Sequence, residues 1–156
     1  MSQAGGMRGS MVIRDEVREA IEQVAAAAEE CKRAYEVWQR ALEERDRRSE
    51  QMERRITKAT GGLSVARFEV ACRRRRVYTV QDAKAKARAL RARPAVEAAV
   101  AERGRVIADA DAKVRSARID LAYATKAVAR YEALGLAMTG LSASDLRRFS
   151  RLPPIT

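Results

Sequence analysis

Basic side chains crowd residues 61–94, and their chemistry is the electrostatic binding of anions. This stretch holds ten lysines and arginines against two acidic residues, Glu69 and Asp82, and so carries +8 of the chain's formal net charge of +11. Such a surplus indicates an acidic partner, which would be an acidic protein surface, a nucleic acid or an anionic membrane face. The predicted partner-binding residues are Arg67, Arg73, Arg74, Arg75, Arg76, Lys84, Lys86, Arg88, Arg91 and Arg93.

Two less specific interpretations of this basic stretch stay open. The charges could serve only to keep one end of the molecule soluble, or the arginine stems could cover the rings of Phe68 and Tyr78. Four consecutive arginines, from Arg73 to Arg76, point in different directions when they lie on a helix. That arrangement suits a diffuse electrostatic contact better than the reading of individual bases.

Catalytic chemistry has little support in the sequence. The chain contains no histidine, which is the commonest general base and metal ligand, and no phosphate-binding glycine loop. Its two cysteines, Cys31 and Cys72, make neither a disulfide framework nor a zinc site. The arginines beside Cys72 favour a reactive thiolate, but its helical spacing from Phe68 is typical of packing. We therefore predict a protein that is not an enzyme and has no cofactor or metal.

A long apolar repeat precedes the basic stretch and must help to position it. Alternate steps of four and three residues from Val17 to Ala59 meet apolar side chains, including Ala28 and Tyr35, with Arg45 and Ser49 as the polar exceptions. Such a period is typical of the seam of a coiled coil, and one strand of a coiled coil is not stable alone. The helix therefore needs a partner.

A second repeat follows the basic stretch and supplies that partner. The same steps from Val96 to Tyr131 meet Arg103 as the one polar side chain. Two helices that fold on each other within one chain in this way must run antiparallel. The sequence thus predicts an all-α fold, a long antiparallel two-helix coiled-coil hairpin with a short basic helical insertion at the bend and a short C-terminal helix.

The register of the two repeats is predicted by matching large side chains with small ones. With Val17 opposite Tyr131, Trp38 faces Ala110 and Cys31 faces Ala117. The same register sets Arg45 opposite Arg103, and these two charges then need a nearby carboxylate or water, because an unpaired buried charge is costly.

Glycine, serine and proline residues mark where the helices should begin and end. Gly61-Gly62 stops the first helix, and Ser64 caps a short helix over 64–76. Asp82 then caps a second short helix over 83–92, which Pro94 ends or kinks, unless it lies in the first turn of the helix that follows. Gly135 and Gly140 end the last long helix, and Ser142 or Ser144 caps a final helix that runs through Phe149. The predicted segments are a disordered tail over 1–10, a hairpin over 11–134 (helix 12–60, basic connection 61–94, second arm 95–134) and a C-terminal segment over 135–156.

The composition sets broad limits on where such a protein acts. At 156 residues the chain is expected to form one domain, with 34% charged and 4% aromatic residues, a profile that favours long helices. No apolar run is long enough to span a membrane, and the N-terminus lacks the apolar core of a signal peptide. We predict a cytoplasmic protein in a reducing compartment. Pairing of the apolar repeats between chains, which would give a homo-oligomer, stays open.

The two repeats, together with Tyr35-Glu-Val-Trp38 and Gly62-Leu63-Ser64-Val65, resemble small proteins of type III secretion and flagellar export, the FliJ/YscO family. The resemblance implies a two-helix antiparallel coiled coil that is similar to the central stalk of rotary ATPases. It also implies a place in the pore of the export ATPase hexamer. It assigns no individual binding residue.

These observations lead to a predicted function and two alternatives. We expect a non-enzymatic coiled-coil stalk or adaptor of a type III secretion-type export apparatus that docks on an ATPase or another acidic partner. The first alternative is a basic coiled-coil nucleic-acid-binding protein, although Tyr78 is the one ring that could stack on bases within the run of basic residues. The second is a structural or assembly protein, for instance of a phage particle.

Overall fold

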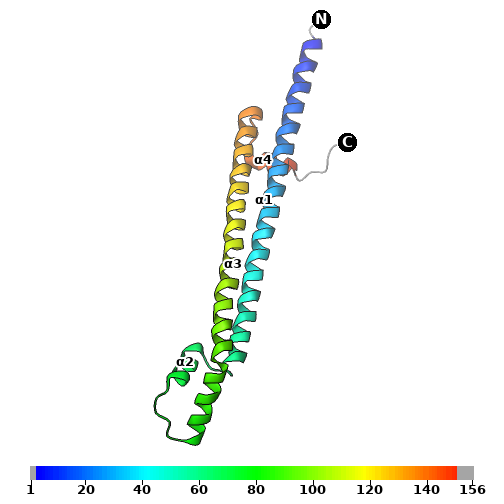
Figure 1. The fold of residues 1–156 in the computed structure, drawn as a ribbon. Helices are drawn as coiled ribbons and strands as arrows, with labels where there is room; N and C mark the ends of the chain where they lie inside the picture. The colour runs from blue at the N-terminus through cyan, green and yellow to red at the C-terminus, as the bar shows by residue number, and fades with distance from the viewer. Residues whose placement is uncertain (1–2, 151–156) are drawn as a thin grey trace. The chain divides into compact units, whose positions relative to one another are not determined.

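The computed structural model describes residues 3–150, and it describes side chains for residues 15–145 and for Arg148. The described chain is entirely helical apart from short connections, so the prediction of an all-α fold is confirmed (Figure 1). Its elements are α1 (Gln3–Ala59), α2 (Val65–Arg73), α3 (Val80–Thr139) and α4 (Ala143–Ser150).

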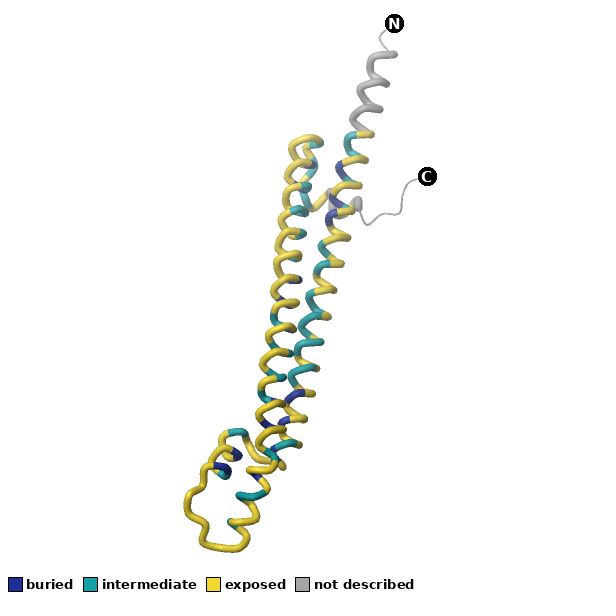
Figure 2. Tube along the Cα trace, in the orientation of Figure 1, coloured by how far each residue is buried: buried dark blue, intermediate teal, exposed yellow. Residues whose placement is uncertain are grey.

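The described chain divides into two compact units, and α1 and α3 contribute to both of them. Unit 1 contains the chain up to Gln39 together with the chain from Arg115 onward, and unit 2 contains Arg40–Val114. In each unit α1 and α3 pack together. Each is described separately below, with burial along the chain shown in Figure 2.

In unit 2, α1 ends where the sequence predicts, at two glycines. Gly61 and Gly62 have φ angles of 66° and 92°, in the left-handed region that side chains disfavour. The amide of Gly62 donates to the carbonyl of Thr57 at 2.8 Å, which satisfies one of the free carbonyls at the helix end. The chain then enters α2, whose N-cap is Ser64 as predicted, because its hydroxyl accepts a hydrogen bond from the amide of Arg67 at 3.2 Å.

The second connection in unit 2 corrects two local predictions. The helix that starts after Ser64 ends at Arg73 rather than at residue 76, since Arg74 has a non-helical ψ angle of 117° and residues 74–78 form a coil. The N-cap of α3 is Thr79, not Asp82, because the Thr79 hydroxyl accepts from the Asp82 amide at 3.1 Å. The Asp82 carboxylate instead pairs with Arg74 at 3.1 Å and ties the two ends of the coil together.

Helix α3 passes through Pro94, so the second long helix begins at Val80 rather than at about residue 95. A proline inside a helix leaves the carbonyl four residues earlier without its donor. Ala89 and Val96, on the two sides of Pro94, are both buried in one cluster with residues of α2. Tertiary packing therefore holds the helix together across the proline.

The ends of α3 and α1 in unit 1 also extend beyond their predicted positions. Helix α3 contains Gly135 and continues to Thr139, and Gly140 ends it with a φ of 71°. The hydroxyl of Ser142 accepts from the Asp145 amide at 3.2 Å, which confirms Ser142 as a cap for α4. At the other end, α1 includes residues 3–10, for which the sequence predicts a disordered tail. Residues 1–2 and 151–156 of the predicted terminal segments lie outside the described residues.

Some buried residues of α1 in unit 1 are those of the predicted seam, and others lie one position away from it. Val24 is fully buried, as predicted, but Ala27 is buried and its neighbour Ala28 is exposed. Tyr35 is likewise half exposed, and its ring lies 5.8 Å from that of Trp38. On a straight helix the buried positions recur every 3.6 residues rather than every 3.5. Counted toward the N-terminus, they therefore shift to lower residue numbers than a strict heptad gives, as from Ala28 to Ala27. Ala20, Val24, Ile21, Tyr131 and Leu141 form the cluster that packs this unit.

The register predicted from the sequence is wrong, by about one heptad. In unit 2, Arg45 lies 3.6 Å from Asp111 and Arg103 lies 2.8 Å from Glu53. In unit 1, Cys31 Sγ lies 3.7 Å from Thr125 Oγ1. The two numbers of each pair add to 156, whereas the predicted register pairs numbers that add to 148. A slip by one heptad keeps the apolar columns facing each other, so the repeat alone cannot choose between registers. The observed register places a carboxylate beside each seam arginine and separates Arg45 from Arg103.

This register predicts a specific disulfide. In a Cys72→Ala background, Thr125→Cys should form an intrachain disulfide with the native Cys31 under mild oxidation, because their side-chain atoms already lie 3.7 Å apart. Ala117→Cys, which faces Cys31 in the register expected from the sequence, is the matched control and should stay reduced. Mobility on non-reducing gels and mass spectrometry measure both. Efficient crosslinking of 31 with 117 and none with 125 would reject the observed register.

Candidate binding surface of unit 2

The ten predicted partner-binding residues all lie in unit 2, on three consecutive pieces of chain. Arg67 and Arg73 belong to α2, Arg74 to Arg76 to the coil that follows it, and the other five to the first turns of α3. Nine of the ten side chains are exposed and Lys86 is half buried. We call this set the basic surface.

Most of the positive charge on the basic surface is not neutralised within the protein. Arg74 pairs with Asp82 at 3.1 Å, and Arg93 pairs with Glu97 at 3.1 Å. Within the described part of the chain, no acidic side chain lies within 4.0 Å of the other eight cations, which are Arg67, Arg73, Arg75, Arg76, Lys84, Lys86, Arg88 and Arg91. Seven exposed cations and the half-buried Lys86 can therefore bind an extended anionic surface.

A cluster of apolar side chains holds the basic surface in place. Phe68 and Cys72 of α2 are buried against Ala89 and Val96 of α3, and Ala59 from the end of α1 packs on the same cluster. A nine-residue helix such as α2 would be marginal in water by itself, so this packing accounts for its order. The sequence prediction that Cys72 serves packing is confirmed, because its residue is buried beside Phe68.

The coil and the first residue of α3 also expose an aromatic and two aliphatic side chains near the arginines. Tyr78 is 74% exposed, Val80 is 72% exposed, and Val77 is exposed to a lesser degree. Phe68 is buried in an apolar cluster with Ala89 and Val96 of α3, and most of Tyr78 is exposed. The interpretation that the arginines serve to shield these two rings is therefore wrong.

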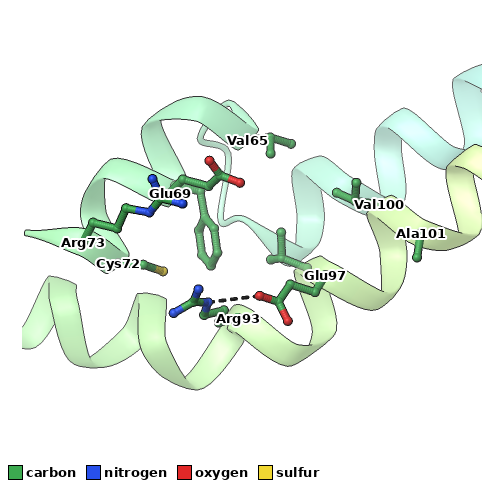
Figure 3. Close-up of a pocket in the computed structure, with 10 residues that line it drawn as sticks. Val65, Glu69, Cys72, Arg73, Arg93, Glu97, Val100 and Ala101 are labelled. Carbon is green, nitrogen blue, oxygen red and sulfur yellow. Dashed lines mark hydrogen bonds and ion pairs between the residues drawn. The ribbon is translucent and has the colours of Figure 1, made fainter.

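A small pocket of about 250 Å³ opens between α2 and α3 on the basic surface (Figure 3). Phe68, Cys72 and Val96 contribute to its apolar lining. Its rim carries Glu69 and Arg73 on the α2 side, and the pair of Arg93 and Glu97 on the α3 side. Two cations and two anions on the rim give no net charge there, so the pocket does not itself select an anion.

Three cations of the basic surface form a regular stripe on α3. Lys84, Arg88 and Arg91 follow one another at intervals of four and three residues, so they lie on one face of the helix, away from Ala89 and Val96. Sequence reasoning identified these residues but treated the surplus charge as diffuse. It missed the stripe because the buried face of the predicted helix over 83–92 was unknown.

Other kinds of site find no support in the described part of the chain. Residues 15–145 with Arg148 contain no group of three or more acidic or cysteine side chains placed to hold a metal ion. None of the helices described here is long and apolar enough to cross a membrane. Comparison with known proteins found no matching family model, no matching curated protein and no matching solved structure. The basic surface is therefore the feature on which a functional proposal must rest.

Proposed function

We propose that this chain is a non-enzymatic helical adaptor that binds an acidic protein surface through the basic surface of unit 2. The observation that carries the proposal is the set of eight cations, seven exposed and one half buried, that have no ion-pair partner among the described residues. The total charge of α1 is close to zero by comparison, since residues 14–60 hold 11 basic and 12 acidic side chains.

The scaffold for this surface is, in our proposal, an antiparallel two-helix coiled-coil hairpin. Residue numbers rise along α1 and fall along α3 through the contacts of each unit, as in the pairs of Arg45 with Asp111 and Glu53 with Arg103. Following the resemblance of the sequence to the FliJ/YscO family, we further propose that the partner is the ATPase of a type III secretion-type export apparatus. The chain would act there as a stalk in the cytoplasm.

A charge-reversal experiment tests this function. Arg75→Glu with Arg76→Glu changes two exposed and unpaired cations of the coil, and Arg40→Glu with Arg47→Glu makes the same change in charge on exposed positions of α1 outside the basic surface. We expect the native chain to stimulate ATP hydrolysis by a purified type III export ATPase. The coil variant should bind on the order of tenfold more weakly, since exposed ion pairs contribute up to about 1 kcal/mol each. Equal stimulation by all three proteins, or none by the native chain, would contradict the ATPase assignment.

One observation favours a second candidate, a single-stranded nucleic acid. Tyr78 is 74% exposed and lies two residues after Arg76 in the chain, and a ring close to cations is the combination that stacks on bases and binds phosphates. Fluorescence anisotropy with random DNA and RNA at two salt concentrations distinguishes the candidates. Binding that weakens steeply with salt and is lost in Tyr78→Ala would favour nucleic acid over an acidic protein.

A further inference from the structure

Acidic side chains form a stripe on α1 in unit 1 that matches the basic stripe on α3 in unit 2. Residues 15–30 hold six acidic side chains and one basic side chain, Arg18. Asp15, Glu19 and Glu22 follow one another at intervals of four and three residues, and all three are exposed. They lie on the face of α1 opposite the buried Val24, because successive residues turn by about 100° around a helix.

The two stripes have the same spacing, and an alanine occupies the next position on the same helix face after each of them. The basic stripe runs through Lys84, Arg88 and Arg91, and the next position on its face is the exposed Ala95. The acidic stripe runs through Asp15, Glu19 and Glu22, and the next position on its face is the exposed Ala26. Two helices laid side by side in these registers bring three cations opposite three carboxylates, and the small alanines allow a close approach.

Most charged side chains of both stripes have no ion-pair partner among the described side chains, so they can pair with charges on another molecule. Asp15 forms an exposed ion pair with Arg18 at 3.3 Å, but among the described side chains neither Glu19 nor Glu22 has an ion-pair partner. The three cations of the basic stripe are also unpaired within the described chain. The acidic surface that complements the basic surface is therefore present on the same polypeptide.

We propose that the basic stripe of one copy binds the acidic stripe of a second copy of this chain. This inference rests on the proposed docking role of the basic surface and adds another copy of the chain to the partners of that surface. The contact joins two different patches, so it either closes into a dimer in which it occurs twice or continues from copy to copy. Because both stripes are exposed, the association weakens steeply as salt screens the charges.

Light scattering on the full chain tests the inference through a charge swap. At about 0.01 M salt, where screening extends over about 30 Å, the native protein should have a mass that rises with concentration, and at about 1 M salt this rise should vanish. Glu19→Lys with Glu22→Lys, and separately Lys84→Glu with Arg88→Glu, should each abolish the rise. An equimolar mixture of these two variants should restore association, because each then presents the charge that the other requires.

Matched controls separate this contact from general charge effects. Glu36→Lys with Glu43→Lys, and Arg40→Glu with Arg47→Glu, change the net charge by the same amounts at exposed positions outside the stripes and should associate like the native protein. Far-ultraviolet circular dichroism checks that every variant remains helical. A native protein whose mass is independent of salt, stripe variants that associate normally, or controls that fail to associate would each overturn the proposal.

A polyglutamate probe distinguishes this inference from the proposed function. If labelled polyglutamate binds the native chain, and binds Lys84→Glu with Arg88→Glu at least about tenfold more weakly, the basic surface is an anion-binding surface. Polyglutamate binding without self-association would then leave the docking function standing and reject the second copy as the partner. If the chain neither binds polyglutamate nor self-associates, both proposals fail.

Discussion

An aspartate in place of Ala27 should destabilise unit 1 by about 3–5 kcal/mol, because it places an unpaired carboxylate between packed helices. Ala27 is 5% exposed. The same substitution at the next residue, Ala28, should cost less than about 1 kcal/mol, since that residue is exposed and loses only helix propensity. The pair is well matched, because both variants change an alanine to an aspartate on the same turn of α1. Chemical denaturation followed by circular dichroism measures the difference.

The comparison of Ala27→Asp with Ala28→Asp tests whether the buried face of α1 is the one in the structure or the one that the heptad repeat predicts. The heptad repeat places Ala28 in the seam and Ala27 outside it, so it predicts the opposite order of effects. If Ala28→Asp is the more destabilising substitution, the buried face of α1 in unit 1 is the one that the repeat predicts. Hydrogen exchange of the amides around residues 20–34 should show that the loss of protection is confined to this part of α1.

Truncation of Phe68 should have a comparable effect on unit 2. Phe68 is 4% exposed and is the largest side chain of the cluster that joins α2 to α3. Phe68→Ala should cost about 3–5 kcal/mol, the usual range for removing a buried aromatic ring. Because α2 has nine residues and cannot persist alone, we expect the amides of Val65–Arg73 to lose their protection from hydrogen exchange.

Val70→Ala provides the control for this experiment. Val70 belongs to the same helix but is 69% exposed, so its truncation should change stability by no more than about 0.5 kcal/mol. Phe68→Ala should also weaken binding to an acidic partner, because Arg67, Arg73 and the coil arginines are positioned by α2. Unchanged protection of α2 in Phe68→Ala would contradict the assignment of this cluster as the support of the basic surface.

The sequence was sufficient to identify which residues make up the candidate site, but not how they are arranged. Counting charges locates all ten basic residues, because charge is a property of the side chain whatever the fold. The pairing of Arg74 with Asp82, the exposure of Tyr78 and the stripe on α3 depend on where helices begin and end. Propensity suggested a helix through Arg76, and at Pro94 it left open an end, a kink or the first turn of the next helix. Packing of Ala89 and Val96 on α2 carries one helix through the proline.

Features that depend on one residue and its neighbours follow directly from the sequence. Gly61 and Gly62 stop α1 because only glycine adopts their φ angles without strain, and Ser64 and Ser142 cap helices through their own hydroxyls. Tertiary structure alone decided how α1 and α3 match in each unit. A helix can slide by one heptad and keep its apolar residues inside. The register of α1 against α3 is therefore selected by the few polar contacts that differ between registers, such as Arg45 with Asp111 and Arg103 with Glu53.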